Sequence, residues 1–264
     1  MSQSQQNKWA LITGASSGIG LELARIHAAA GGHLAIAARR ESKLAELKEE
    51  LEGRHGVKVM TFACDLSRPG AATQLYEDIK AASIKVDYLI NNAGFGGHGK
   101  FHERDWEADA QMINLNILAL AELTRRFLPD FVARNSGRIL NVSSTAGEVP
   151  GPLQAVYYAS KAFVTSFSNA IAEELSDTNI TVTSLKPGYT ETEFADAAHL
   201  RSTRLVSGGG ATAASVAQDG YDAMLAGQLN RISGMGLSQR IQLAMAPMAP
   251  RKMLLKQIRQ LQEG

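Results

Sequence analysis

Cysteine is almost absent from this chain, which has only Cys64 among its 264 residues. A single cysteine excludes an internal disulfide, and no companion ligands stand at the spacing of a metal site. We therefore expect a reducing compartment and no metal. Cys64 itself is interpreted as a small apolar residue of a strand.

Long apolar runs and an excess of one charge are also missing. No apolar run reaches the roughly 18 residues of a membrane-spanning helix, and residues 1–9 lack the apolar core of a signal peptide. The 27 Lys and Arg nearly balance the 26 Asp and Glu, which gives no indication of a nucleic acid as partner. These absences predict a soluble, cytoplasmic protein that acts on a small or neutral ligand.

Short apolar runs alternate with segments of helical periodicity along one domain-sized chain. Strands that are apolar on both faces predict a parallel sheet with helices on each side, a Rossmann-like, doubly wound α/β fold of three α/β/α layers. Ligands of such sheets bind beyond the carboxyl ends of the strands. The predicted strands are 8–13, 33–38, 57–63, 87–91, 137–143 and 180–186, and the predicted helices are 19–31, 41–53, 71–83, 106–134, 156–175 and 213–225, the last with Thr212 as N-cap.

A glycine-rich loop follows the first predicted strand. Residues 13–20 read TGASSGIG, with Gly14, Gly18 and Gly20 ahead of an amphipathic helix. Such glycines allow a tight turn, close approach of a phosphate and close helix packing, and the helix N-terminus favours a pyrophosphate. A plain strand-to-helix turn can look similar, but strand, loop and helix occur together here, so we predict a nucleotide-binding loop.

The exit of the second predicted strand indicates which nucleotide binds. An acidic residue about 20 positions past the loop would bond the 2′-hydroxyl of NAD, but here Arg39 and Arg40 follow Ala38. A guanidinium suits a 2′-phosphate, so NADP(H) is favoured over NAD(H). The alternative is a charged strand exit that is merely solvated. Ser16 and Ser17 offer further donors to the phosphate.

Three more polar stretches follow apolar runs: NNAG (91–94), NVSS (141–144) and YYASK (157–161). With the loop at 13–20, an Asn in the next helix and a later Pro-Gly at 187–188, they form an ordered pattern. Because of this pattern, the chain resembles the compact, single-domain type of short-chain dehydrogenase/reductase. The resemblance covers about residues 8–230. The resemblance implies an NADP(H)-dependent oxidoreductase that moves a hydride between nicotinamide and a carbonyl or alcohol.

Two adjacent tyrosines compete for the catalytic role. Tyr157 lies four positions and Tyr158 three positions before Lys161, and both spacings share a helix face, so spacing alone leaves the choice open. The resemblance favours Tyr157, which begins Y-x-x-x-K thirteen positions after Ser144, and implies that Tyr158 turns toward the protein body. Reduction of a carbonyl needs a proton donor, and a nearby ammonium lowers the pKa of a tyrosine from its usual value of about 10.

The remaining catalytic roles are implied by the same resemblance. Lys161 would also hold the nicotinamide ribose, Ser144 would bond the substrate oxygen, and Asn116 would hold a water that links Lys161 to solvent, with Asn114 as a competitor. Taken singly, a Ser after a strand, a Tyr on a helix or a mid-helix Asn is more often structural. Their occurrence together and in order predicts the set Asn116, Ser144, Tyr157 and Lys161.

Further cofactor contacts carry over from the family pattern. Asp65 resembles the residue that meets the adenine, although it could equally cap the helix after Pro69. The full set of expected cofactor contacts is Gly14, Ser16, Ser17, Gly18, Ile19, Gly20, Arg39, Arg40, Asp65, Leu66, Asn92, Ala93, Gly94, Tyr157, Lys161, Pro187, Gly188, Thr190 and Thr192.

Three loops are expected to form the substrate pocket: 95–101, 146–156 and 193–210. They combine glycines with apolar side chains, so we expect an apolar ketone, aldehyde or secondary alcohol as substrate and a lid in the last loop. The expected apolar wall residues are Phe95, Val149, Leu153 and Phe194, and the loop histidines His98 and His199 are interpreted as solvated.

Residues 231–264 depart from the alternation of strands and helices and are interpreted as a helical extension of the 1–230 domain. Basic and apolar residues interleave in this tail. Such a helix packs on its own domain, touches a membrane surface weakly or joins subunits of a dimer or tetramer, and we expect the first.

Two other functions compete with the enzyme: an NADP(H)-binding redox sensor without turnover, and a nucleotide-sugar epimerase, for which the chain lacks a large second domain.

Overall fold

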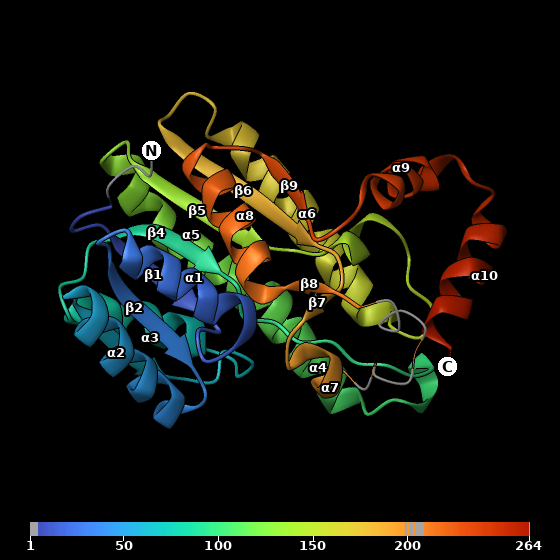
Figure 1. Cartoon of the computed structure of the whole chain (residues 1–264), viewed down its shortest axis with the longest axis horizontal. Coiled ribbons are helices and arrows are strands. Elements are labelled where there is room, and N and C mark those ends of the chain that lie inside the picture. Colours follow the sequence, from blue (N-terminus) through green and yellow to red (C-terminus); the bar gives the residue numbers. More distant parts are fainter. Residues whose placement is uncertain (1–4, 199, 201–202, 204–208, 264) are drawn as a thin grey trace.

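The computed structural model describes residues 5–198, 200, 203 and 209–263. Within this range a seven-stranded parallel sheet has the order β3-β2-β1-β4-β5-β6-β9 (Figure 1). Its strands are β1 (Trp9–Thr13), β2 (His33–Ala38), β3 (Val59–Ala63), β4 (Val86–Asn91), β5 (Gly137–Val142), β6 (Ile180–Pro187) and β9 (Asn230–Ser233), and β7 (Thr190–Glu191) pairs separately with β8 (Ala211–Thr212).

Helices cover both faces of this sheet (Figure 1). The α-helices are α1 (Gly18–Ala29), α2 (Glu41–His55), α3 (Ala71–Ala81), α4 (Trp106–Ile113), α5 (Leu120–Ala133), α6 (Ala155–Glu174), α7 (Phe194–Ala197), α8 (Ala213–Leu225), α9 (Leu237–Met245) and α10 (Arg251–Gln262). Short helical turns are η1 (Phe101–Glu103), η2 (Asn114–Ala119), η3 (Thr145–Glu148) and η4 (Ala246–Met248).

The core has two layers because alternate residues of each strand face opposite sides of the sheet. In β1, Ala10 and Ile12 pack with α1, α2 and α8, whereas Leu11 packs with α3, α5 and α6. All three side chains are fully buried. The predicted three-layer, doubly wound fold is therefore confirmed.

The six predicted strands and the N-cap at Thr212 are confirmed with small shifts at their ends. The Thr212 side chain accepts a hydrogen bond from Ser215 N, and helix α8 starts at the next residue. The long helix expected over 106–134 is divided, because residues 114–119 form a π-helical turn between α4 and α5. Such turns often mark functional sites.

Strand β9 was not predicted, because Asn230–Ser233 is short and mostly polar and contains no apolar run. This strand pairs with β6. The sheet therefore includes residue 231, the position from which the alternation of strands and helices was expected to stop. Beyond it, α9 and α10 lie to one side of the body in Figure 1. Helix α10 buries Leu254 and Ile258, in agreement with packing on the same domain, whereas α9 buries none of its residues.

No helix within the described part of the chain is both long and apolar enough to cross a bilayer.

Candidate functional site

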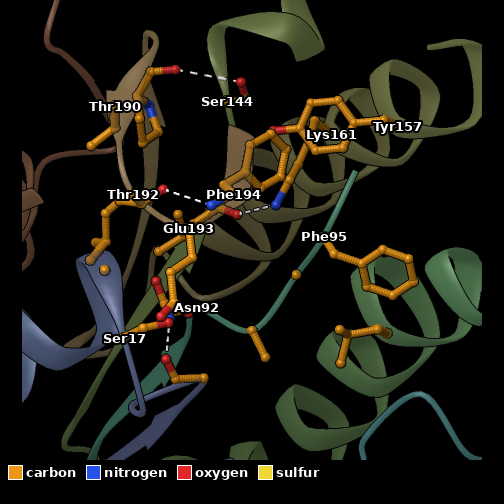
Figure 2. Close-up of a pocket in the computed structure, with 18 of the residues that line it drawn as sticks. Ser17, Asn92, Phe95, Ser144, Tyr157, Lys161, Thr190, Thr192, Glu193 and Phe194 are labelled. Atoms are coloured by element: carbon orange, nitrogen blue, oxygen red, sulfur yellow. Dashed lines mark hydrogen bonds between the residues drawn. The ribbon is translucent and has the colours of Figure 1, made fainter. Parts of the chain in front are cut away.

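A cavity of about 440 Å³ opens at the carboxyl ends of the strands (Figure 2). It lies where neighbouring strands β1 and β4 send their connections to opposite sides, which is the usual ligand position in such sheets. All the expected cofactor contacts line it except Gly20, and of the four expected catalytic residues only Asn116 does not. The structure therefore brings most of the predicted site residues together around one cavity.

The glycine loop is shaped by backbone conformations that glycine adopts most readily. Gly14 and Gly18 have φ of +68° and +57°. A Cβ on Gly20 would lie 2.4 Å from the Asn92 Nδ2 and from the Gly14 carbonyl oxygen. Gly20 thus lets α1 pack against the NNAG segment, while Gly14 and Gly18 form the cavity wall.

The N-terminus of α1 faces this cavity with its backbone donors uncapped. Ser17 is the N-cap residue, but its side chain makes no capping hydrogen bond. The first N–H groups of a helix need an outside acceptor, and an anionic pyrophosphate is a suitable one. The loop and this helix end fit a dinucleotide cofactor.

The two arginines at the exit of β2 differ in their surroundings. Arg40 donates to the Ser16 hydroxyl at 3.1 Å and to Glu193 at 2.9 Å. Burial acts to raise the pKa of Asp65, but hydrogen bonds from Ser67 and, to a smaller extent, the charge of Arg39 lower it below its usual value. Both arginines line the cavity at the exit of β2, next to the residues that follow β3.

Asp65 is not a helix cap. Its carboxylate accepts hydrogen bonds from the backbone and hydroxyl of Ser67, whereas Gly70 is the N-cap of α3. The capping alternative for Asp65 is therefore wrong, because the chain makes an extra turn before the helix begins. Asp65 and Leu66 both line the cavity.

Tyr157 lies at the buried inner end of the cavity, and its ring packs 5.2 Å from that of Phe194 (Figure 2). Burial raises the pKa of Tyr157 well above its usual value of about 10, while the Ser144 hydroxyl acts in the opposite direction through a hydrogen bond. Ser144 also accepts from Ala146 N and lies 3.4 Å from the Pro187 carbonyl oxygen. Tyr157 and Ser144 are thus adjacent.

Lys161 is buried beside these groups. Its Nζ donates to the Val142 carbonyl oxygen at 2.8 Å and lies 5.9 Å from the centre of the Tyr157 ring (Figure 2). Burial lowers the pKa of Lys161 to about 8. In the free protein the pKa of Tyr157 is raised and not lowered, because the loss of solvation is the largest effect on this hydroxyl.

Asn116 lies in the π-helical turn and behind the cavity wall. Its amide oxygen accepts from Phe95 N, and its amide nitrogen donates to the Phe95 carbonyl and the Ser160 hydroxyl. A Cβ on Gly94 would lie 3.0 Å from Asn116 Oδ1 and 3.3 Å from Lys161 Nζ. The two side chains therefore meet behind Gly94, with Asn116 holding the loop that follows NNAG.

The segment after β6 closes the cavity over the glycine loop. A Cβ on Gly18 would lie 3.0 Å from the Thr192 methyl group, so the two loops are in close contact. Thr192 accepts from Phe194 N at 3.2 Å (Figure 2). Thr190 donates to the Gly188 carbonyl. These bonds fix the start of the loop that was expected to act as a lid.

Only part of the expected substrate wall lines the cavity. Phe95 and Phe194 do, whereas Val149 packs beside Tyr157 and Leu153 lies outside the lining. The interpretation of His98 as solvated is wrong: its Nε2 lies 2.9 Å from the Gln262 carbonyl oxygen at the end of α10. His199 falls outside the described residues.

Three polar side chains of this cavity were not among its predicted residues. Gln154 and Tyr158 line it beside Tyr157, and Glu193 lines its outer part beside Arg40. Gln154 and Glu193 stand in loops where no periodicity singles out one residue. Tyr158 was expected to turn toward the body, and it is indeed buried, but part of it also faces the cavity.

Comparisons with known proteins find related sequences and structures. The family model described as short chain dehydrogenase matches residues 8–202. Mouse dehydrogenase/reductase SDR family member 7B is 34% identical over 230 residues, which are 83% of this chain and 71% of that protein. An NADP-dependent 3-hydroxy acid dehydrogenase of Schizosaccharomyces pombe is 38% identical over 71% of this chain and 73% of its own length.

Among solved structures, a short-chain dehydrogenase from Sphingobium yanoikuyae in complex with NADPH has a TM-score of 0.82 at 30% identity, covering 97% of this chain and 98% of that one. A Burkholderia phymatum relative in complex with NAD also has a TM-score of 0.82, at 25% identity over 93% of this chain and 95% of its own. The matched segment spans only 62% and 53% of two fungal relatives, from Pseudocercospora fijiensis and Laccaria bicolor.

Proposed function

This chain belongs to the short-chain dehydrogenase/reductase family, and we propose that it is an NADP(H)-dependent oxidoreductase that interconverts an apolar ketone or aldehyde and the corresponding alcohol. One observation supports this most strongly. The cavity that has the uncapped α1 N-terminus and Arg39 at one end has Ser144, Tyr157 and Lys161 at the other. A single ligand-sized space thus joins a nucleotide site to a proton donor.

In the free protein Tyr157 is in the protonated form that reduction of a carbonyl requires. The raised pKa of Tyr157 keeps its hydroxyl protonated at neutral pH, ready to protonate the oxygen of a carbonyl that receives a hydride. Bound NADPH supplies that hydride. Ser144, next to Tyr157, donates to the same oxygen and stabilises the charge that develops on it.

Lys161 acts by charge and by position. Its pKa of about 8 leaves the ammonium group charged at neutral pH, on the inner side of Gly94 and near Tyr157. When the cofactor binds, Lys161 would hold its nicotinamide ribose, and the ammonium would stabilise the tyrosinate that remains after proton transfer. Asn116 fixes the Phe95 backbone and so the wall opposite Tyr157.

NADP(H) is proposed over NAD(H) because Arg39 and Arg40 line the cavity at the end of β2 with no acidic residue in their place. The related proteins include both cofactors, since one is named NADP-dependent and another was solved with NAD. The choice therefore depends on these two side chains.

Cofactor preference and turnover are tested together by following the oxidation of NADPH and NADH with aromatic and aliphatic ketones and aldehydes. We expect turnover that prefers NADPH. Tight NADPH binding without turnover of any carbonyl would instead support the redox-sensor alternative. Absence of NADPH binding would contradict both.

A cytoplasmic, homo-oligomeric enzyme remains part of the proposal, with weak membrane contact of the tail as an option. On α9, Leu237, Ile241 and Met245 are exposed and follow one another at four-residue spacing. Size measurement on dilution and sedimentation with anionic vesicles, both repeated with Leu237→Ser/Ile241→Ser, would detect either contact. Unchanged behaviour in both assays would exclude this stripe as an interface.

A further inference from the structure

The last turn of the chain is tied to the cavity through buried amide groups. Gln262 is fully buried at the end of α10. Its Nε2 donates to the Tyr158 hydroxyl oxygen at 2.8 Å, and its Oε1 accepts from Gln154 Nε2. Its backbone carbonyl accepts from His98, so one residue of the tail holds three side chains of the pocket region.

This arrangement leaves two polar atoms of cavity-lining residues without a full set of described partners. Gln154 is only 2% exposed, and no described residue donates to its Oε1. Tyr158 accepts from Gln262, so its own O–H remains available, and no acceptor for it is found among the described residues. Both side chains line the cavity, and the Tyr158 ring lies 6.1 Å from that of Tyr157.

An unsatisfied buried polar atom is costly, roughly 1–3 kcal/mol, and calls for a partner. A hydroxyl group matches this pair, because it donates to an amide oxygen and accepts from a phenol. Beside the reacting groups Ser144, Tyr157 and Lys161, the lining of the cavity includes the apolar side chains of Phe95, Phe194 and Leu200. The needed hydroxyl therefore belongs on an otherwise apolar molecule.

We propose that Gln154 Oε1 and the Tyr158 O–H form a second polar recognition point, which selects substrates with a hydroxyl group a few bonds from the reacting carbonyl. Gln262 is the positioning residue that holds both. This inference rests on the proposed function, and it narrows the substrate class to hydroxyketones and the corresponding diols. A site built to bond a hydroxyl discriminates against the analogue that lacks it.

The test compares acetophenone with 2-hydroxyacetophenone, which differ by one hydroxyl. The ratio of their kcat/KM values in each variant is divided by the wild-type ratio, which cancels the intrinsic reactivity of the two ketones. We expect Gln154→Met to lower the relative preference for the hydroxyketone about tenfold and Gln262→Met to lower it by a smaller factor, mainly through KM. The exposed Gln257→Met on the same helix is the matched control.

Binding separates this inference from the proposed reaction. Calorimetry with 1-phenyl-1,2-ethanediol and 1-phenylethanol on NADP-saturated Tyr157→Phe protein needs no turnover. Tighter binding of the diol that is lost on adding Gln154→Met supports the recognition point, even if no ketone is reduced. Equal binding of both alcohols, or an unchanged ratio in Gln154→Met with NADPH affinity and thermal stability retained, would overturn it and leave the proposed reaction standing.

Discussion

Arg40 and Glu193 face each other across the outer part of the cavity, with Arg40 Nη2 2.9 Å from Glu193 Oε2. They come from the exit of β2 and from the loop after β7. Hydrogen bonding to Arg40 keeps the pKa of Glu193 below its usual value, so this carboxylate is charged at neutral pH. In the free protein, an arginine proposed to bind the 2′-phosphate is thus already paired with an anion.

Replacing Glu193 with Gln should strengthen NADPH binding, because it removes a negative charge that competes with the phosphate for Arg40. Both side chains are largely exposed, at 45% and 63%, so the effect is limited, roughly a three- to tenfold lower Kd. Fluorescence titration with NADPH and NADH at two salt concentrations measures it. Glu46→Gln, an exposed carboxylate paired with Lys43, is the control. A weaker affinity for NADPH in Glu193→Gln would show that Glu193 helps to hold the cofactor instead.

Replacing Arg39 with Asp should reverse the cofactor preference. The new carboxylate would repel a 2′-phosphate and could accept from the 2′-hydroxyl of NADH. We expect the ratio of NADPH to NADH affinity to fall by a factor of about 100. The 2′-phosphate loses a charge-assisted hydrogen bond from the guanidinium and is repelled by the new carboxylate. If titration gave the same ratio as wild type, Arg39 would be a solvated strand exit only.

The reductive reaction should weaken above pH 8. Burial lowers the pKa of Lys161 to about 8, so the ammonium group is charged below that pH and neutral above it. Because its charge stabilises the developing tyrosinate, kcat/KM for reduction should be level from pH 6 to 7.5 and fall above pH 8. Steady-state rates at constant ionic strength, measured at saturating NADPH, give the profile. A level profile up to pH 10 would mean that charge on Lys161 is not required.

Two glycine-to-alanine changes should have opposite effects on stability. A Cβ on Gly20 would lie 2.4 Å from a backbone oxygen and from Asn92, which forces α1 away from the sheet. We expect a loss of about 2–4 kcal/mol in the free energy of unfolding. Gly53 lies exposed within α2 with no atom within 4 Å of a new Cβ, so Gly53→Ala should add about 0.5–1 kcal/mol.

Urea unfolding of the two glycine variants beside wild type gives both values. Equal stability of Gly20→Ala and wild type would contradict the close packing of α1 on the NNAG segment.

The strands and the cofactor loop were predictable because their signals are local. Apolar runs such as 33–38 identify buried strands directly, and the glycines of 13–20 are spaced by the turn that they make. Strand β9 was not predictable from the sequence, because its sequence is polar and its pairing with β6 stabilises it as a strand. Its identity as a strand depends on a neighbour more than forty residues away.

The polar contacts between residues that line the pocket could not be predicted from the sequence either. Gln154 and Gln262 are 108 positions apart, and no pattern in either segment indicates that their amides meet. The raised pKa of Tyr157 in the free protein was likewise not predictable, because the sequence does not show how deeply this hydroxyl is buried. Residue order indicates which chemical groups are present, and burial decides how they titrate.

The choice between the two adjacent tyrosines tests the central claim most directly. NADPH oxidation with acetophenone should be compared in wild type, Tyr157→Phe and Tyr158→Phe, with NADPH affinity measured in each. We predict that Tyr157→Phe lowers kcat at least a thousandfold with little change in NADPH affinity, whereas Tyr158→Phe stays within about tenfold of wild type. Retained turnover in Tyr157→Phe, or a larger loss in Tyr158→Phe, would contradict the assignment of Tyr157 as the proton donor.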